Sequence, residues 1–70
     1  MKITIFGASG GIGKFVVKHA LDKGYCVTAY VRNVSKLKIF HENLTVITGE
    51  LTNYKCIKKA ITGCSYEIHL

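Results

Sequence analysis

Short runs of β-branched and aromatic residues alternate along the chain with segments in which apolar residues recur at helical spacing. Such runs are typical of strands, and strands buried inside a parallel sheet are apolar on both faces. The predicted strands comprise residues 3–6, 25–31, 44–48 and 64–70. The pattern therefore predicts four strands separated by helical segments.

The first predicted helix follows a glycine cluster and ends at Gly24, because glycine is common just after the last turn of a helix. Its apolar positions at helical spacing are Ile12, Phe15, Val16, Ala20 and Leu21. A second, short helix or helical turn is predicted over residues 34–41, around Leu37 and Phe40.

The third predicted helix lies between the third and fourth strands and ends at Gly63. Thr52 or Asn53 can cap its first turn, because both side chains accept hydrogen bonds from backbone N–H groups. Its apolar positions are Tyr54, Ile57 and Ile61. Alternating strands and helices require crossover connections, so we expect an α/β fold with an open parallel sheet of about four strands in the order 3-2-1-4.

Glycines stand at the first, fourth and seventh positions of the segment that joins the first strand to the first helix. Gly7 permits a tight turn, Gly10 lets the backbone approach a pyrophosphate, and Gly13 lets the helix pack closely on the sheet. A turn that merely joins strand to helix would not need all three. A Walker-type loop is excluded because Phe15 stands where Ser or Thr is required. The pattern favours a dinucleotide site at the helix N-terminus.

Arg32 follows the second strand, at the position where sites that prefer NAD carry an acidic residue for the ribose 2′-hydroxyl. A guanidinium can instead pair with a 2′-phosphate through two hydrogen bonds, and Lys36 can add charge one helical turn further on. The sequence thus favours NADPH over NADH. The alternative is that Arg32 is an ordinary solvated surface residue.

The 70 residues carry a net charge of +6, which invites a nucleic-acid interpretation. The lysines are instead spread over the predicted helical segments, where a solvated outer face is the usual explanation. We therefore expect no nucleic-acid site, and a positive field that favours an anionic dinucleotide. The lysines concerned are Lys14, Lys18, Lys23, Lys36, Lys38, Lys55, Lys58 and Lys59.

Cys26, Cys56 and Cys64 are an odd number without C-x-x-C spacing, so they predict reduced, mostly buried thiols rather than disulfides or a zinc site. The three histidines lie on separate predicted elements and no metal site is expected. The N-terminal apolar run is too short for a signal peptide or a membrane span. A cytoplasmic location without membrane attachment is therefore expected.

Three segments together resemble the atypical short-chain dehydrogenase/reductase family, and within it the NAD(P)H-binding proteins that include biliverdin-IXβ (flavin) reductases and NmrA-like regulators. The segments are residues 7–13, GASGGIG, residues 31–37, VRNVSKL, and residues 49–52, GELT. The resemblance implies a partial Rossmann fold. It implies pyrophosphate contacts from Gly7, Ser9, Gly10, Gly11 and Ile12.

The same resemblance implies that Arg32 and Lys36 contact the adenosine 2′-phosphate. Glu50 and Leu51 stand where the family has an Asp and an apolar residue that bracket the adenine. Glu50 is one methylene longer than that Asp, which alters its hydrogen bond to the adenine amino group.

No catalytic residue is assigned. Tyr54 and Lys58 have the Tyr-x-x-x-Lys spacing of classical relatives, but they follow the third strand, whereas the relatives' pair follows the fifth. We interpret Tyr54 as a packing residue and Lys58 as solvated surface.

Family members run longer and build their nicotinamide and substrate pockets from further strands. Residues 1–70 are thus interpreted as one truncated NAD(P)-binding domain, the N-terminal cofactor-binding part of an NADPH-dependent oxidoreductase, and inactive alone. The alternatives are a non-catalytic NADP-sensing module and an inactive fragment. The apolar sheet left open at the fourth strand predicts self-association or a partner chain.

Overall fold

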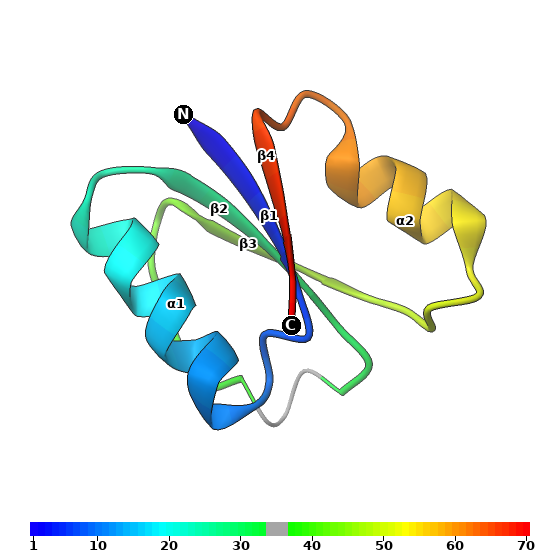
Figure 1. The fold of residues 1–70 in the computed structure, drawn as a ribbon, viewed down its shortest axis with the longest axis horizontal. Coiled ribbons are helices and arrows are strands. Elements are labelled where there is room, and N and C mark those ends of the chain that lie inside the picture. The colour runs from blue at the N-terminus through cyan, green and yellow to red at the C-terminus, as the bar shows by residue number, and fades with distance from the viewer. Residues whose placement is uncertain (34–36) are drawn as a thin grey trace.

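The computed structural model describes residues 1–33 and 37–70. They form one four-stranded sheet in the order β3-β2-β1-β4, with a helix on either side (Figure 1). All three strand pairs are parallel, which confirms the predicted α/β fold and strand order. The elements are β1 (Lys2–Phe6), α1 (Gly11–Asp22), β2 (Cys26–Val31), β3 (Leu44–Thr48), α2 (Tyr54–Ile61) and β4 (Tyr66–His69).

The two faces of the sheet carry different side chains because successive residues of a strand point to opposite faces. The core on the α1 side contains Ile3, Ile5, Val27, Ala29 and Val31 of the sheet with Val17, Ala20 and Leu21 of the helix. On the other face, Phe6 and Tyr30 pack with Ala60 of α2. Thr4 is fully buried, and its Oγ1 donates a 2.7 Å hydrogen bond to the carbonyl oxygen of Ala60.

The predicted ends of both helices are confirmed. α1 is followed by Gly24, whose positive φ of 85° suits glycine at the end of a helix. α2 begins after Asn53, whose side chain accepts a 3.1 Å hydrogen bond from the N–H of Cys56, so Asn53 rather than Thr52 is the cap. Neither helix among the described residues is long and apolar enough to cross a membrane.

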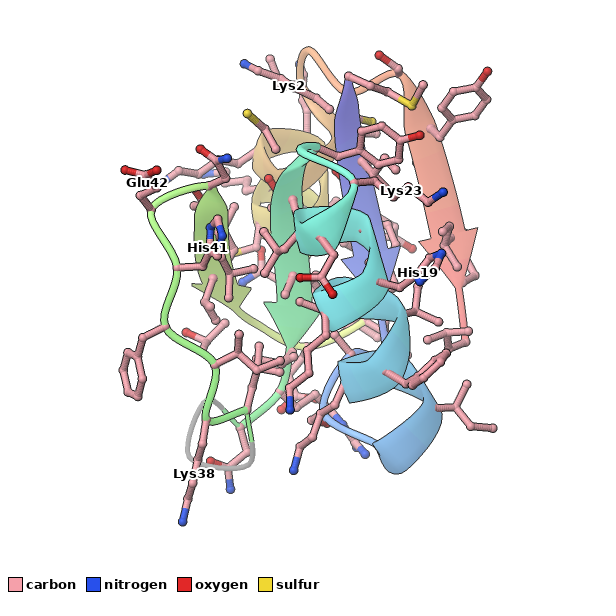
Figure 2. The ribbon with its side chains drawn as sticks, turned by 90° about the vertical axis from the view of Figure 1, so that its left-hand side faces the viewer. Lys2, His19, Lys23, Lys38, His41 and Glu42 are labelled. Carbon is pink, nitrogen blue, oxygen red and sulfur yellow. The ribbon has the colours of Figure 1, made fainter. Side chains whose placement is uncertain are left out.

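The helix predicted over residues 34–41 is absent from residues 37–41, and residues 34–36 lie outside the described part of the chain. Leu37 is buried in the α1-side core, but Phe40 is 94% exposed. The crossover returns from the carboxyl end of β2 to the amino end of β3, and five extended residues span about 17 Å, against about 7.5 Å for five helical ones. A non-helical path can therefore cover more of that distance. In Figure 2 this segment can be followed along the labelled side chains of Lys38, His41 and Glu42.

α1 packs through Val16, Ala20 and Leu21 of the predicted stripe, but its first turns are rotated so that Val17 takes the place of Phe15. Its buried residues are Gly13, Val17, Ala20 and Leu21. Ile12 and Phe15, both on the predicted stripe, are 75% and 71% exposed. A side chain at position 13 would overlap the backbone of Ala8, so glycine is needed where the helix lies against this loop, and the contact fixes the rotation of the helix.

In α2, the predicted residues Ile57 and Ile61 pack against the core beside the buried Ala60, whereas Tyr54 is 81% exposed. Tyr54 is therefore not the packing residue that the sequence predicts, because it begins the helix at the edge of the contacting face. The cysteines are free, as expected, but they are not mostly buried: Cys26 is exposed, and Cys56 and Cys64 are half-buried. Among the described residues, the eight residues of α2 form the helix on this face, and β3 and β4 contain no fully buried residue.

Candidate functional site

The loop between β1 and α1 lies at the carboxyl end of the sheet. Gly7 turns the chain with a φ of +80°, and its N–H donates a 3.3 Å hydrogen bond to the carbonyl oxygen of Tyr30 on β2. A Cβ at Gly13 would lie 2.6 Å from Ala8 Cα and from Gly7 O, which are backbone atoms that cannot move aside. The predicted turn at Gly7 is thus confirmed, and the predicted close packing at Gly13 is made against the backbone of the loop that joins β1 to α1.

The first turn of α1 has the features of an anion site. Gly10 is the N-cap without a side-chain cap, and the first helical hydrogen bond runs from Lys14 N to Gly10 O at 2.9 Å. The preceding N–H groups, from Gly11 to Gly13, therefore have no partner within the helix. This turn contains no acidic residue. These N–H groups and the helix dipole favour a phosphate.

Open space surrounds this turn. An added Cβ would meet no atom within 4 Å at either Gly10 or Gly11. A pocket of about 370 Å³ adjoins the turn and is lined by Gly7, Gly10, Gly11, Ile12, Gly13 and Leu70. Leu70 comes from the end of β4, where its N–H donates to Phe6 O at 3.1 Å. The residues present fit a dinucleotide pyrophosphate, because the backbone is bare where the phosphates would lie.

Arg32 lies at the same edge of the sheet as the loop. Phe6 and Tyr30 are register partners at the ends of β1 and β2, so Arg32 follows β2 just as Gly7 and Ala8 follow β1. Its side chain is exposed and makes no ion pair with any residue in the described ranges. Lys36, the predicted second cation, lies outside the described residues.

The loop after β3 reaches this edge as well. Gly49 N donates to Val31 O at 3.0 Å, which ties the loop to the end of β2. Glu50 and Leu51 follow with exposed side chains, and Leu51 is 66% exposed. The parallel register thus brings the glycine loop, Arg32 and this loop to one edge of the sheet, as the sequence predicts.

Tyr30 is a residue of this region that the sequence analysis missed. Its hydroxyl donates a 2.7 Å hydrogen bond to the carbonyl oxygen of Glu50, and burial raises the pKa of that hydroxyl above its ordinary value, with Cys56 and Glu50 raising it further. The signal was a tyrosine in a buried strand, because a buried phenol needs a hydrogen-bond partner.

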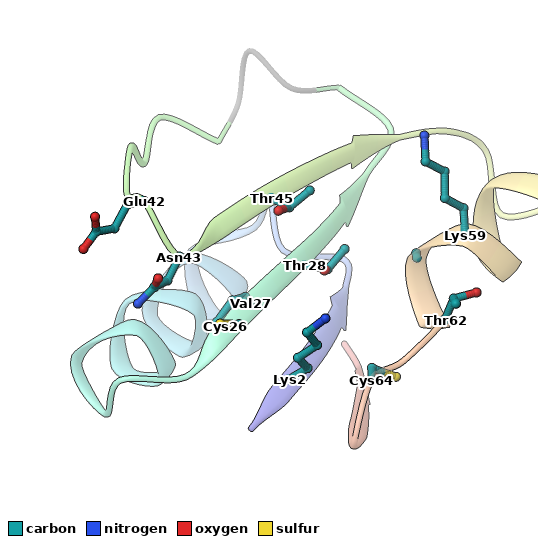
Figure 3. Close-up of a pocket in the computed structure, with 11 residues that line it drawn as sticks. Lys2, Cys26, Val27, Thr28, Glu42, Asn43, Thr45, Lys59, Thr62 and Cys64 are labelled. Carbon is teal, nitrogen blue, oxygen red and sulfur yellow. The ribbon is translucent and has the colours of Figure 1, made fainter.

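A second pocket, of about 250 Å³, lies at the opposite end of the sheet (Figure 3). Lys2 and Cys26, which open β1 and β2, line it together with Lys59 from the end of α2. It is therefore separated from the glycine loop by the length of the strands. Within residues 1–33 and 37–70 no three His, Cys, Asp or Glu side chains are placed to hold a metal ion.

The fold and the glycine loop define a dinucleotide-binding α/β domain of the Rossmann type. Residues 7–68 match the family described as NAD(P)H-binding, and the chain belongs to that family. The chain is an NAD(P)H-binding domain, and the curated proteins to which it is similar include reductases.

Two curated relatives are similar over nearly the whole chain. The photosystem II assembly factor Ycf39 of Cyanophora paradoxa is 38% identical over 64 residues, 90% of this chain and 20% of that protein. Cinnamoyl-CoA reductase 1 of Petunia hybrida is 35% identical over 75 residues, 96% of this chain and 22% of that protein. The chain thus spans about a fifth of their length, corresponding to their N-terminal part.

Among solved structures, a Rossmann-fold NAD(P)-binding family protein from Shigella flexneri superposes with a TM-score of 0.90 at 27% identity. The match covers 99% of this chain and 36% of that one.

Proposed function

We propose that the chain binds NADPH in preference to NADH, with the 2′-phosphate held by Arg32 and, through added charge, by Lys36. The observation that carries this proposal is the exposed Arg32 guanidinium at the edge of the sheet that also holds the glycine loop. Guanidinium pairs with phosphate through parallel N–H···O hydrogen bonds. NADH has no 2′-phosphate for Arg32 to contact.

The remaining contacts are assigned to the two loops. We assign the pyrophosphate to Gly7, Ser9, Gly10, Gly11, Ile12 and Gly13, which form or adjoin the open first turn of α1. Glu50 and Leu51 are assigned to the adenine, because both are exposed beside the end of β2. When bound, the cofactor would supply a hydride, whereas the residues of this chain bind and orient it.

Calorimetric titration with NADPH and NADH tests the proposal. The unmodified chain is expected to bind NADPH more tightly than NADH. Arg32→Ala is expected to lower the ratio of the two affinities roughly tenfold or more, the effect of losing a charge-assisted contact. Lys38→Ala, which removes a lysine of the same crossover segment, is the matched control for charge. Equal affinities of the unmodified chain for both cofactors would contradict the assignment of Arg32.

We further propose that this domain is the cofactor-binding part of an NADPH-dependent oxidoreductase, which the cinnamoyl-CoA reductase relative supports. The 70 residues alone are expected to bind NADPH without consuming it. The second candidate is a non-catalytic NADP-sensing module, which the assembly-factor relative favours. The test is to give an aldehyde or a thioester to a longer polypeptide that contains this domain. Oxidation of NADPH by that polypeptide would support the first candidate over the second.

We also propose that the chain associates with itself or a partner through β4, the edge strand next to β1. Tyr66 on this strand is 60% exposed, and within residues 1–33 and 37–70 no strand pairs with the outer edge of β4. A cytoplasmic location remains part of the proposal, and the free cysteines support a reducing compartment.

A further inference from the structure

Two buried hydroxyl groups of the sheet hold the two ends of the α2 crossover. Thr4 Oγ1 donates a 2.7 Å hydrogen bond to Ala60 O in the last turn of α2. Tyr30 Oη donates a hydrogen bond of the same length to Glu50 O in the loop before α2. Only the second bond lies beside the residues assigned to the adenine.

The Tyr30 side chain has little freedom to move. It is 1% exposed, and its ring centroid lies 5.3 Å from that of Phe6, its register partner on β1. Because the ring is packed in the core, the position of the hydroxyl is set by the sheet rather than by the loop. The loop must therefore adapt to the hydroxyl.

The loop after β3 is shaped around this hydroxyl. A Cβ at Gly49 would overlap Tyr30 Oη and would lie 3.2 Å from Cys56 Cβ, so this position requires glycine while Tyr30 is present. Glu50 O accepts a second hydrogen bond, of 3.0 Å, from Asn53 N. The peptide of Glu50 is consequently fixed from two directions, by Tyr30 and by the capping residue of α2.

We propose that Tyr30 is a positioning residue for the adenine side of the cofactor site, acting through the backbone of Glu50. The inference rests on the proposed function, in which Glu50 and Leu51 contact the adenine. The phenol fixes the position and orientation of the loop after β3 relative to the end of β2. It thereby determines how well the site distinguishes adenine from other bases, without touching the cofactor.

The Tyr30→Phe variant tests this inference because it keeps the ring and removes only the hydroxyl. Dissociation constants are measured by calorimetric titration for NADPH, for NADH, and for deamino-NADPH, in which hypoxanthine replaces adenine. The preference for NADPH over deamino-NADPH is expected to fall roughly fivefold, the effect of losing one ordinary hydrogen bond. The preference for NADPH over NADH, which is assigned to Arg32, is expected to stay unchanged.

Thr4→Val is the matched control, because it removes the equivalent buried hydroxyl bond at the other end of α2 and keeps a β-branched side chain. It is expected to lower the melting temperature and to leave both preferences unchanged. A loss of adenine preference in Thr4→Val as large as that in Tyr30→Phe would mean general loosening, and the inference would be wrong. An unchanged adenine preference in Tyr30→Phe would overturn it equally.

A second variant keeps the inference testable if Tyr30→Phe does not fold. Gly49→Ala leaves Tyr30 in place and pushes the loop away from its hydroxyl, so the same roughly fivefold loss of adenine preference is expected. A folded Gly49→Ala variant that keeps the full preference for NADPH over deamino-NADPH would overturn the inference. If the unmodified chain binds none of the three dinucleotides, the proposed function itself fails.

Discussion

Replacing single glycines of the first loop with alanine separates the role of this loop in folding from its role in binding. A Cβ at Gly13 would lie 2.6 Å from two backbone atoms, whereas one at Gly11 would meet nothing within 4 Å. Both positions are helical, so alanine gains up to about 1 kcal/mol of helix propensity at each. The two variants therefore differ mainly in what surrounds the added methyl group.

For Gly13→Ala, overpacking in a rigid contact costs about 1–3 kcal/mol, and the helix-propensity gain offsets part of this. The expected net loss is about 1–2 kcal/mol of the free energy of unfolding, which lowers the melting temperature by roughly 5–15 °C in a domain of this size. For Gly11→Ala, the melting temperature is expected to stay or to rise by a few degrees, since the methyl group points into open space.

Gly11→Ala, which is expected to keep its stability, should lose cofactor affinity. The space beside Gly11 is where the phosphates are proposed to lie, so the methyl group of Gly11→Ala should displace them from the N–H groups of α1. Loss of one charge-assisted hydrogen bond corresponds to roughly 10- to 100-fold weaker NADPH binding. Thermal unfolding by circular dichroism and calorimetric titration are the two assays. A Gly11→Ala variant that keeps full stability and full NADPH affinity would refute the proposed phosphate site.

Three further predictions concern stability and association. Asn53→Ala removes the side-chain cap of α2 and should cost about 1 kcal/mol, seen as a melting temperature lower by roughly 4–8 °C, whereas Thr52→Ala should have little effect. Because the pKa of Tyr30 is raised in the folded state, its stabilising effect is present below the unfolded value of 10.0 and is lost as the pH rises above that value. Denaturant titrations at pH 9 to 11 should therefore show a smaller fall in the free energy of unfolding for Tyr30→Phe than for the unmodified chain. Tyr66→Lys places a charge on the edge of β4 and should reduce concentration-dependent association in sedimentation velocity, and a chain that is monomeric at all concentrations would contradict the proposed association.

The strands, their order and the ends of the helices could be predicted from the sequence because each depends on local signals. The runs that became β1, β2 and β3 are apolar and β-branched, and Gly24 and Asn53 stand where helices end and begin. The strand order then follows from the need for crossover connections between parallel strands. The path of residues 37–41 could not be predicted in this way, because the distance between two strand ends selects it.

The rotation of α1 could not be predicted from periodicity either. Its apolar residues occupy more than one face, so Phe15 and Val17 are equally acceptable packing residues by spacing. The contact between Gly13 and the loop selects the face with Val17, and this contact exists only once the loop has turned onto the sheet. Tyr54 was misassigned for a different reason, because it begins α2 at the edge of the face that contacts the sheet.

The candidate site was predictable as far as its residues belong to motifs at the ends of strands. The register of a parallel sheet brings such residues to one edge, which is where the structure places Gly7, Arg32 and Glu50. The contact between Tyr30 and Gly49 joins β2 to the loop after β3; a tyrosine in a buried strand signals that its hydroxyl has a partner, but the sequence does not say which residue it is. The roles of the site residues in cofactor binding are predictions.

The most direct test of the central claim is to record the backbone amide NMR spectrum of the ¹⁵N-labelled chain while NADPH is added. If the first turn of α1 holds the pyrophosphate, the largest shifts are expected at the amides of Gly10, Gly11, Ile12 and Gly13, with smaller ones at Arg32 and Glu50. The amides of Lys2 and Cys26, at the opposite end of the sheet, should stay in place. Shifts confined to that opposite end, or no shifts at millimolar NADPH in a folded chain, would contradict the account.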